Sequence, residues 1–243
     1  MHQKGGFQLD KLVGFSGFPK RGLQFLNDLS ENNNRDWFEA HKSEYQTYLL
    51  EPAQAFVAAL GTKLQTIAKV HYDTRTDGSG TLMRIYRDTR FSKNKEPYKI
   101  SLGGKFWNSE RKKSEGPSFG FHLNANGIGL MAGMFDFSPP ILQAYRDAVA
   151  NDELGSTLEE ILDSLIRVGN YEINGEHFKR VPTGYDSNHK RSKLLRHNAF
   201  YVHIKEIGLD ALETPKLVEK CFEHFNNMKP VYKWLDDVIR EID

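Results

Sequence analysis

The chain has 243 residues, of which 39% are hydrophobic and 12% aromatic, and its formal net charge at pH 7 is +1. This content can bury one substantial core. No apolar run approaches the roughly 20 residues that cross a bilayer, and the first residues lack the apolar stretch of a secretory signal. We therefore expect a soluble, cytoplasmic protein that binds no membrane, with a flexible tail over residues 1–14 and a single domain over residues 15–243.

The sequence contains a single cysteine, Cys221, which excludes an intramolecular disulfide and a thiolate metal cluster within one chain. Its neighbours Val218, Phe222 and Phe225 lie at helical spacing. We therefore expect Cys221 to be a buried core residue and not a nucleophile.

Three helices are predicted in the N-terminal part of the chain. Apolar residues between 23 and 29 recur at helical spacing, and three asparagines at 32–34 then interrupt the pattern. Asn34 suits the N-cap of a second helix that carries aromatic residues from Trp37 to Tyr48. Pro52 is expected to open or kink a third helix, because proline is best tolerated in a first helical turn.

Alternating polarity replaces helical spacing after a polar loop at residues 77–80. An extended, partly buried segment is predicted, with one side formed by Met83, Ile85 and Phe91 and the other by Arg84, Tyr86, Asp88 and Arg90. A second extended run covers residues 100–107. A hairpin is predicted between residues 118–123 and 128–134, because the intervening Asn-Ala-Asn-Gly segment has turn composition.

Helices and short strands alternate in the second half. Ser138 followed by two prolines predicts a helix start, and two capping-box patterns, at 156–159 and 157–160, predict another. Short strands are expected at 171–173, 177–180 and 200–204, with a loop at 182–188, and two helices are expected to begin at Thr214-Pro215 and after Pro230. This order favours an α+β fold, mainly an antiparallel sheet flanked by N-terminal, central and C-terminal helices.

Positive charge is concentrated in two segments although the chain is nearly neutral. Residues 84–99 hold six Lys or Arg and two acids, a formal charge of +4, and residues 177–197 hold six Lys or Arg and one acid, a charge of +5. The other 206 residues therefore sum to −8. This asymmetry indicates a local field that suits a small anion better than long duplex DNA.

The pattern R-x-x-R-D-x-R-F-x-x-N-K-x-x-Y spans Arg84 to Tyr98. With it the chain resembles a bacterial family known as domain of unknown function 2461. Residues 33–38, 131–134 and 146–148 also carry the resemblance, which would cover nearly the whole chain as one domain. It implies little about activity, because the family's name assigns none. It does imply that members are recognised by Arg84, Arg87, Asp88, Arg90, Phe91, Asn94, Lys95 and Tyr98.

The basic pattern also has a chemical interpretation. A guanidinium presents a rigid fork of donors that matches carboxylate or phosphate and stays charged at any working pH. Asp88 could orient one arginine through a bidentate pair. Because cations surround it, we expect the pKa of Asp88 to be lowered, which favours orientation over proton abstraction. The candidate ligand-binding residues are Arg84, Arg87, Asp88, Arg90, Asn94, Lys95 and Tyr98.

Three hypotheses follow for this segment. The first is a small phosphate- or carboxylate-bearing ligand held in one enclosed basic cleft, with residues 177–197 nearby, in a binding protein or an enzyme. The second is an interaction module that binds nucleic acid or an acidic protein on an open basic surface. The third is an ion-pair network that fixes helices onto the sheet and serves folding alone.

Other kinds of site have weaker support. The histidines show neither the H-x-x-x-H nor the H-E-x-x-H spacing of a helical zinc site, so we expect no metal and no cofactor. A phosphate-binding G-x-x-x-x-G-K-[ST] loop does not occur in the sequence. Nothing in the sequence identifies a catalytic residue.

Overall fold

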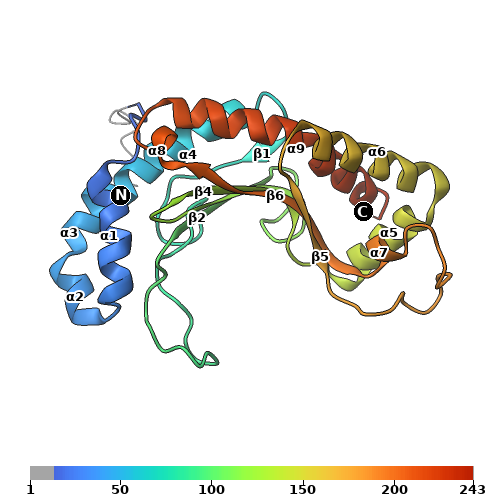
Figure 1. Cartoon of the computed structure of the whole chain (residues 1–243), viewed down its shortest axis with the longest axis horizontal. Helices are drawn as coiled ribbons and strands as arrows, with labels where there is room; N and C mark the ends of the chain where they lie inside the picture. Colours follow the sequence, from blue (N-terminus) through green and yellow to red (C-terminus); the bar gives the residue numbers. More distant parts are fainter. Residues whose placement is uncertain (1–13, 243) are drawn as a thin grey trace, which may run out of the picture.

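The computed structural model describes residues 14–242 and contains a six-stranded sheet in the order β1-β2-β3-β4-β6-β5, with all neighbouring strands antiparallel (Figure 1). The strands are β1 (Val70–His71), β2 (Leu102–Asn108), β3 (Ser118–Leu123), β4 (Gly127–Met134), β5 (Glu172–Glu176) and β6 (His197–Gly208). The helices are α1 (Lys20–Glu31), α2 (Arg35–Ala40), α3 (Lys42–Tyr45), α4 (Glu51–Leu64), α5 (Pro139–Ala150), α6 (Asp152–Val168), α7 (Ser192–Leu195), α8 (Leu209–Leu212) and α9 (Lys216–Arg240). The predicted α+β class is confirmed.

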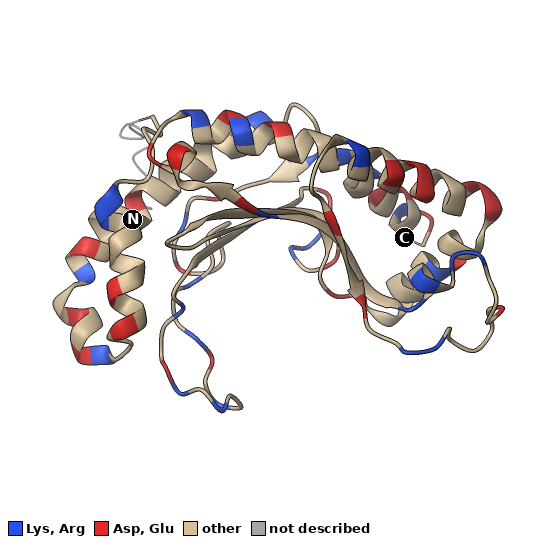
Figure 2. Ribbon diagram, viewed as in Figure 1, with Lys and Arg blue, Asp and Glu red and all other residues tan. Residues whose placement is uncertain are grey.

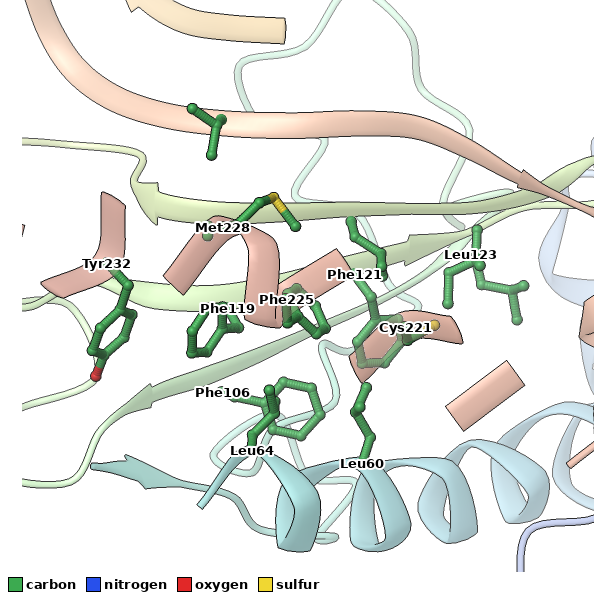
Figure 3. Close-up of a cluster of buried hydrophobic side chains, with 14 of the residues drawn as sticks. Leu60, Leu64, Phe106, Phe119, Phe121, Leu123, Cys221, Phe225, Met228 and Tyr232 are labelled. Carbon is green, nitrogen blue, oxygen red and sulfur yellow. The ribbon is translucent and has the colours of Figure 1, made fainter. Parts of the chain in front are cut away.

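One face of the sheet packs against α4 and α9, and the main core lies between these layers (Figure 3). The ring of Phe121 lies 5.2 Å from that of Phe56 in α4, and Phe119 lies 5.1 Å from Phe225 in α9. Cys221 lies in the same layer with an exposed fraction of 0%, and burial raises the pKa of its thiol far above the usual range. The prediction that Cys221 is a core residue is therefore confirmed.

Between residues 14 and 242, no helix covers the centre of the opposite face of the sheet (Figure 1). Burial alternates along β2, so that Phe106 faces the helices while Lys105 and Trp107 face away from them. Helices α1–α3 stand at one end of this face and α5–α7 at the other, which gives the molecule its arched outline. We call this surface the open face of the sheet.

The N-terminal predictions are largely confirmed. Asn34 caps α2, because its side-chain oxygen accepts a hydrogen bond from the backbone N–H of Trp37 at 3.0 Å. Pro52 lies in the first turn of α4. The predicted second helix is divided into α2, α3 and a π-helical turn over Gln46–Leu50 that runs directly into α4.

The predicted hairpin is formed by β3 and β4. The side chain of Asn124 accepts hydrogen bonds from the backbone N–H groups of Asn126 and Gly127, at 2.7 and 3.0 Å. This local bonding closes the turn and sets the register of the two central strands.

Two predictions for the second half are wrong because local signals were overruled. Helix α9 continues through Pro230, since Met228 and Val231 on either side are fully buried and their packing outweighs the lost helical hydrogen bond. The capping boxes at 156–159 and 157–160 lie inside α6, which begins earlier because Asn151 caps it.

Residues 177–180 also form no strand, because the chain leaves the sheet after Glu176 at the end of β5. None of the helices between residues 14 and 242 has the length and apolar content of a membrane span. The division into a tail over residues 1–14 and one domain over 15–243 stays a prediction, and residues 1–13 lie outside the described part of the chain.

Candidate functional site

Residues 84–99 form an irregular loop that projects from the sheet, and not the predicted strand (Figure 1). Its base carries two isolated bridges, Leu82 to Gly104 and Tyr86 to Tyr98. The predicted apolar side of Met83, Ile85 and Phe91 is wrong. Ile85 is buried, but Met83 is 45% and Phe91 95% exposed. Without a neighbouring strand along its length, the segment cannot keep one side against the core.

The base of the loop is fixed to the turn between α1 and α2. The ring of Tyr98 stacks on that of Phe38 at 4.1 Å between centroids. Asn33 donates from its side chain to the carbonyl of Tyr98 at 3.0 Å and accepts from the backbone N–H of Tyr98 at 3.1 Å. Two of the sequence segments that carry the family resemblance therefore meet here.

The outer part of the loop is held by bonds within itself. Arg90 makes a bidentate pair with Asp88, Nε to Oδ1 at 3.0 Å and Nη2 to Oδ2 at 2.7 Å. Hydrogen bonds from Arg90 lower the pKa of Asp88, as predicted. Lys95 donates to the carbonyl of Thr89 at 3.0 Å, and Asn94 donates to Glu96 at 2.7 Å.

A pocket of about 290 Å³ lies between α2 and the loop, and we call it the arginine pocket. It brings together two of the predicted ligand-binding residues, Arg87 and Tyr98, with five that the chemical interpretation did not include. The complete lining is Arg35, Glu39, Tyr86, Arg87, Thr89, Pro97 and Tyr98.

The charges around the arginine pocket leave one cation unmatched. Glu39 pairs with Lys42 at 3.0 Å, and Arg87 pairs with Glu96 through a long contact of 3.3 Å. Within residues 14–242, the side chain of Arg35 makes no hydrogen bond and no ion pair. The pocket therefore has an excess of positive charge that an anion would neutralise.

Tyr98 adds a neutral donor to this pocket. It is only 2% exposed, and burial raises the pKa of its hydroxyl, so it stays protonated at physiological pH. Its hydroxyl makes no hydrogen bond to any residue in the described part of the chain and is available to a ligand.

Arg84, predicted to share a face with Arg90, does not line the arginine pocket. It lies at the base of the loop, where Lys99 donates to its carbonyl at 2.9 Å. Of the seven predicted residues, the structure therefore brings only two into the pocket, leaves four in the outer loop and places Arg84 elsewhere.

The second basic segment, residues 177–197, lies at the other end of the arch from the loop (Figure 2). Three of its six cations, Lys190, Arg191 and Arg196, pair with acids of the protein. The side chain of Arg191 is 0% exposed and donates to Glu159 at 2.8 Å, and Arg196 pairs with Glu176 at 2.8 Å. The prediction that both basic segments surround one ligand is therefore wrong.

A larger pocket, about 540 Å³, lies beside α9 and contains a different kind of cluster. Asp236 accepts a hydrogen bond from Asn108 at 2.6 Å and pairs with Arg240 and, at 3.7 Å, with Arg111. Burial raises the pKa of Asp236, and the two arginines oppose this rise. Because its charges face one another, we attribute this cluster to anchoring α9 on the end of β2.

Two of the pocket residues that were not predicted to bind a ligand lie in segments that stand out in the sequence. Arg35 lies in the 33–38 segment that carries the resemblance, and Tyr86 alternates with Arg84 in the basic segment. Neither could be assigned to a shared pocket, because the contact joins parts of the chain more than fifty residues apart. Over residues 14–242, no three His, Cys, Asp or Glu side chains are placed to hold a metal ion.

The sequence profile of a family described as "Conserved hypothetical protein (DUF2461)" matches residues 21–234. The chain belongs to the DUF2461 family. No curated protein matches it. In this DUF2461 member, six residues of the Arg84–Tyr98 pattern have three different structural roles. Tyr98 fixes the base of the loop and Arg87 faces the pocket, while Asp88, Arg90, Asn94 and Lys95 shape the outer loop.

Proposed function

We propose that this DUF2461 protein binds a small anionic ligand, bearing phosphate or carboxylate, in the arginine pocket. The observation that carries the proposal is the unmatched guanidinium of Arg35 beside that of Arg87 in a pocket of about 290 Å³. This volume is near the lower end of the range for small-molecule sites, roughly 300–1,000 Å³. A compact metabolite fits these dimensions better than a polymer.

The roles of the lining residues follow from their chemistry. Arg35 and Arg87 supply forked N–H donors to an oxyanion, and Tyr98 supplies one neutral O–H donor. The contact of Arg87 with Glu96 is long, so a ligand oxyanion can compete with Glu96 for this guanidinium. Tyr86, which is 52% exposed, stands at the rim and can cover the bound ligand.

The ion-pair alternative accounts for the outer loop and not for the pocket. Arg90 and Asp88 are 78% and 59% exposed, and exposed pairs add little to stability because water screens them. This pair shapes the loop and does not fix a helix onto the sheet. Arg35 has no such pair, which leaves a ligand as its best partner.

The proposal can be tested by thermal unfolding in the presence of phosphate, pyrophosphate, nucleoside mono- and diphosphates and dicarboxylates. A ligand at 100 times its dissociation constant raises the stability by about 2.7 kcal/mol. We expect at least one of these anions to raise the melting temperature of the wild type and not of Arg87→Gln.

Arg90→Gln is the matched control, since it removes one guanidinium from the same loop but outside the pocket. It should retain the full ligand-dependent shift. Equal loss in both variants, or no shift with any anion in the panel, would remove the support for a ligand in the arginine pocket.

A further inference from the structure

The open face of the sheet carries a row of cationic side chains that is separate from the arginine pocket. It begins at Arg84 and Lys99, at the base of the loop, and continues through Lys105 on β2 to Lys113. We call these four residues the basic strip. His122 lies between its two halves, because it pairs with Gly103, two residues before Lys105 on the same side of β2.

The basic strip is not neutralised by the protein's own acids. Within residues 14–242, none of its four members makes an ion pair with a carboxylate. Asp73, an acid in the neighbourhood of Lys113, is already bonded to Arg75, Nε to Oδ2 at 2.6 Å. Lys99 donates to the carbonyl of Arg84 and Lys113 to that of Gly80, but these neutral acceptors leave the positive charge of the strip unneutralised.

The close grouping of these four cations lowers the free energy of unfolding. Burial lowers the pKa of Lys99, with Arg84 adding to the effect, and burial lowers the pKa of Lys105, with Lys113 adding to it. Both lysines thus lose hydration and lie close to a like charge. Ion pairing within the protein does not explain why these cations are gathered on one surface, whereas an external polyanion does.

An aromatic ring continues the basic strip. Trp107 lies two residues beyond Lys105 on the same side of β2, with the ammonium of Lys113 5.1 Å from its ring centroid and the ring of His71 at 4.7 Å. The side chains of Met83 and Met131 lie against the backbone of the neighbouring positions Gly103 and Gly120. An aromatic face beside cations suits a base stacked next to its phosphate.

We propose that the open face binds single-stranded nucleic acid, with the basic strip contacting successive phosphates and Trp107 stacking on a base. A single strand is favoured over a duplex because only an unstacked base can use an aromatic face. The arched sheet, with helices at both ends, also presents a surface along which a flexible strand can lie (Figure 1).

Binding is measured by the fluorescence anisotropy of labelled DNA and RNA strands of about 12 nucleotides, with a hairpin duplex for comparison. If four phosphates are neutralised, affinity should fall about 50-fold between roughly 50 and 200 mM salt. Lys105→Gln should weaken binding and reduce the slope of log affinity against log salt by about 0.7. Trp107→Ala should weaken binding without changing that slope, because stacking releases no counterion.

Lys220→Gln is the matched control, since it removes an exposed lysine from α9, on the covered side of the sheet. It should bind as the wild type does. Trp107→Phe keeps an aromatic face and should retain most of the affinity, which separates stacking from any loss of folding in Trp107→Ala.

Several results would overturn this inference. They are equal binding of the hairpin, displacement of the strand by an equally long polyglutamate peptide, or an unchanged affinity in Lys105→Gln. Arg87→Gln should bind the strand normally, so this inference and the small-anion proposal can fail independently.

Discussion

Tyr98 links the arginine pocket to the rest of the protein. Its ring stacks on Phe38 in α2, and its backbone makes two hydrogen bonds to the side chain of Asn33. These contacts hold the end of an otherwise irregular loop against the N-terminal helices. The distance between Arg35 on α2 and Arg87 on the loop therefore depends on Asn33.

We expect Asn33→Ala to lower the free energy of unfolding by about 1–2 kcal/mol, because two partly buried hydrogen bonds are lost. It should also reduce ligand-dependent stabilisation, since the loop is less firmly placed beside α2. Chemical denaturation with and without the anion selected in the thermal panel measures both effects.

Asn32→Ala provides the comparison, because Asn32 is exposed and, within the described residues 14–242, its side chain bonds only to the carbonyl of Asp28 at the end of α1. Its cost should stay near 0.5 kcal/mol, with an unchanged response to ligand. If both variants behave alike, Asn33 has no special part in positioning the pocket.

At the scale of elements, the loop shows how far sequence patterns reach. Alternating polarity predicted an extended segment at residues 84–99, and its backbone does run without helix. A strand also needs a neighbour for its backbone groups, and periodicity alone does not reveal whether one exists. The basic pattern consequently identified the right segment but the wrong arrangement of its side chains.

Helix α9 shows a different error, in which a local signal predicts a helix boundary where the structure has none. Pro230 is a valid local signal for a helix boundary, yet the helix continues because buried residues on both sides pack against the sheet and α4. Contacts made far along the chain, such as Phe119 with Phe225, decide the outcome. Local signals predicted the structure correctly where the hydrogen bonds join residues close in sequence, as at the Asn34 cap and the Asn124 turn.

For the whole molecule, the cations of the basic segments and of the basic strip lie in three different environments. The arginine pocket and the basic strip keep unmatched cations, whereas half of the cations in residues 177–197 pair with acids at the same end of the arch. Counting charges along the chain could locate the basic segments. It could not reveal which of them face solvent, because their partners come from other elements.

Stability of the whole fold should decrease in mild acid because of buried histidines. Burial lowers the pKa of His197, which is 2% exposed, and of His224, which is half-buried. In the unfolded chain both titrate near 6.5. As pH falls below about 6.5 the unfolded state therefore takes up protons that the folded state does not, so the stability present above this pH is lost progressively.

His197→Asn tests this linkage, since an asparagine amide can still donate to the carbonyl of Lys193, which His197 contacts at 3.1 Å. The free energy of unfolding should depend less on pH between 7.5 and 5.5 than in the wild type. His177→Asn, at an exposed position, should leave the pH dependence unchanged. Identical curves for all three proteins would disprove a contribution from burial of His197.

Anomalous scattering from a crystal soaked in tungstate, a heavy tetrahedral oxyanion similar in shape to phosphate, tests the small-anion proposal most directly. We expect a peak in the arginine pocket within hydrogen-bonding distance of both Arg35 and Arg87, and its loss in Arg87→Gln. A pocket without tungstate, with Arg87 still directed to Glu96 while the ion binds elsewhere, would contradict the proposal.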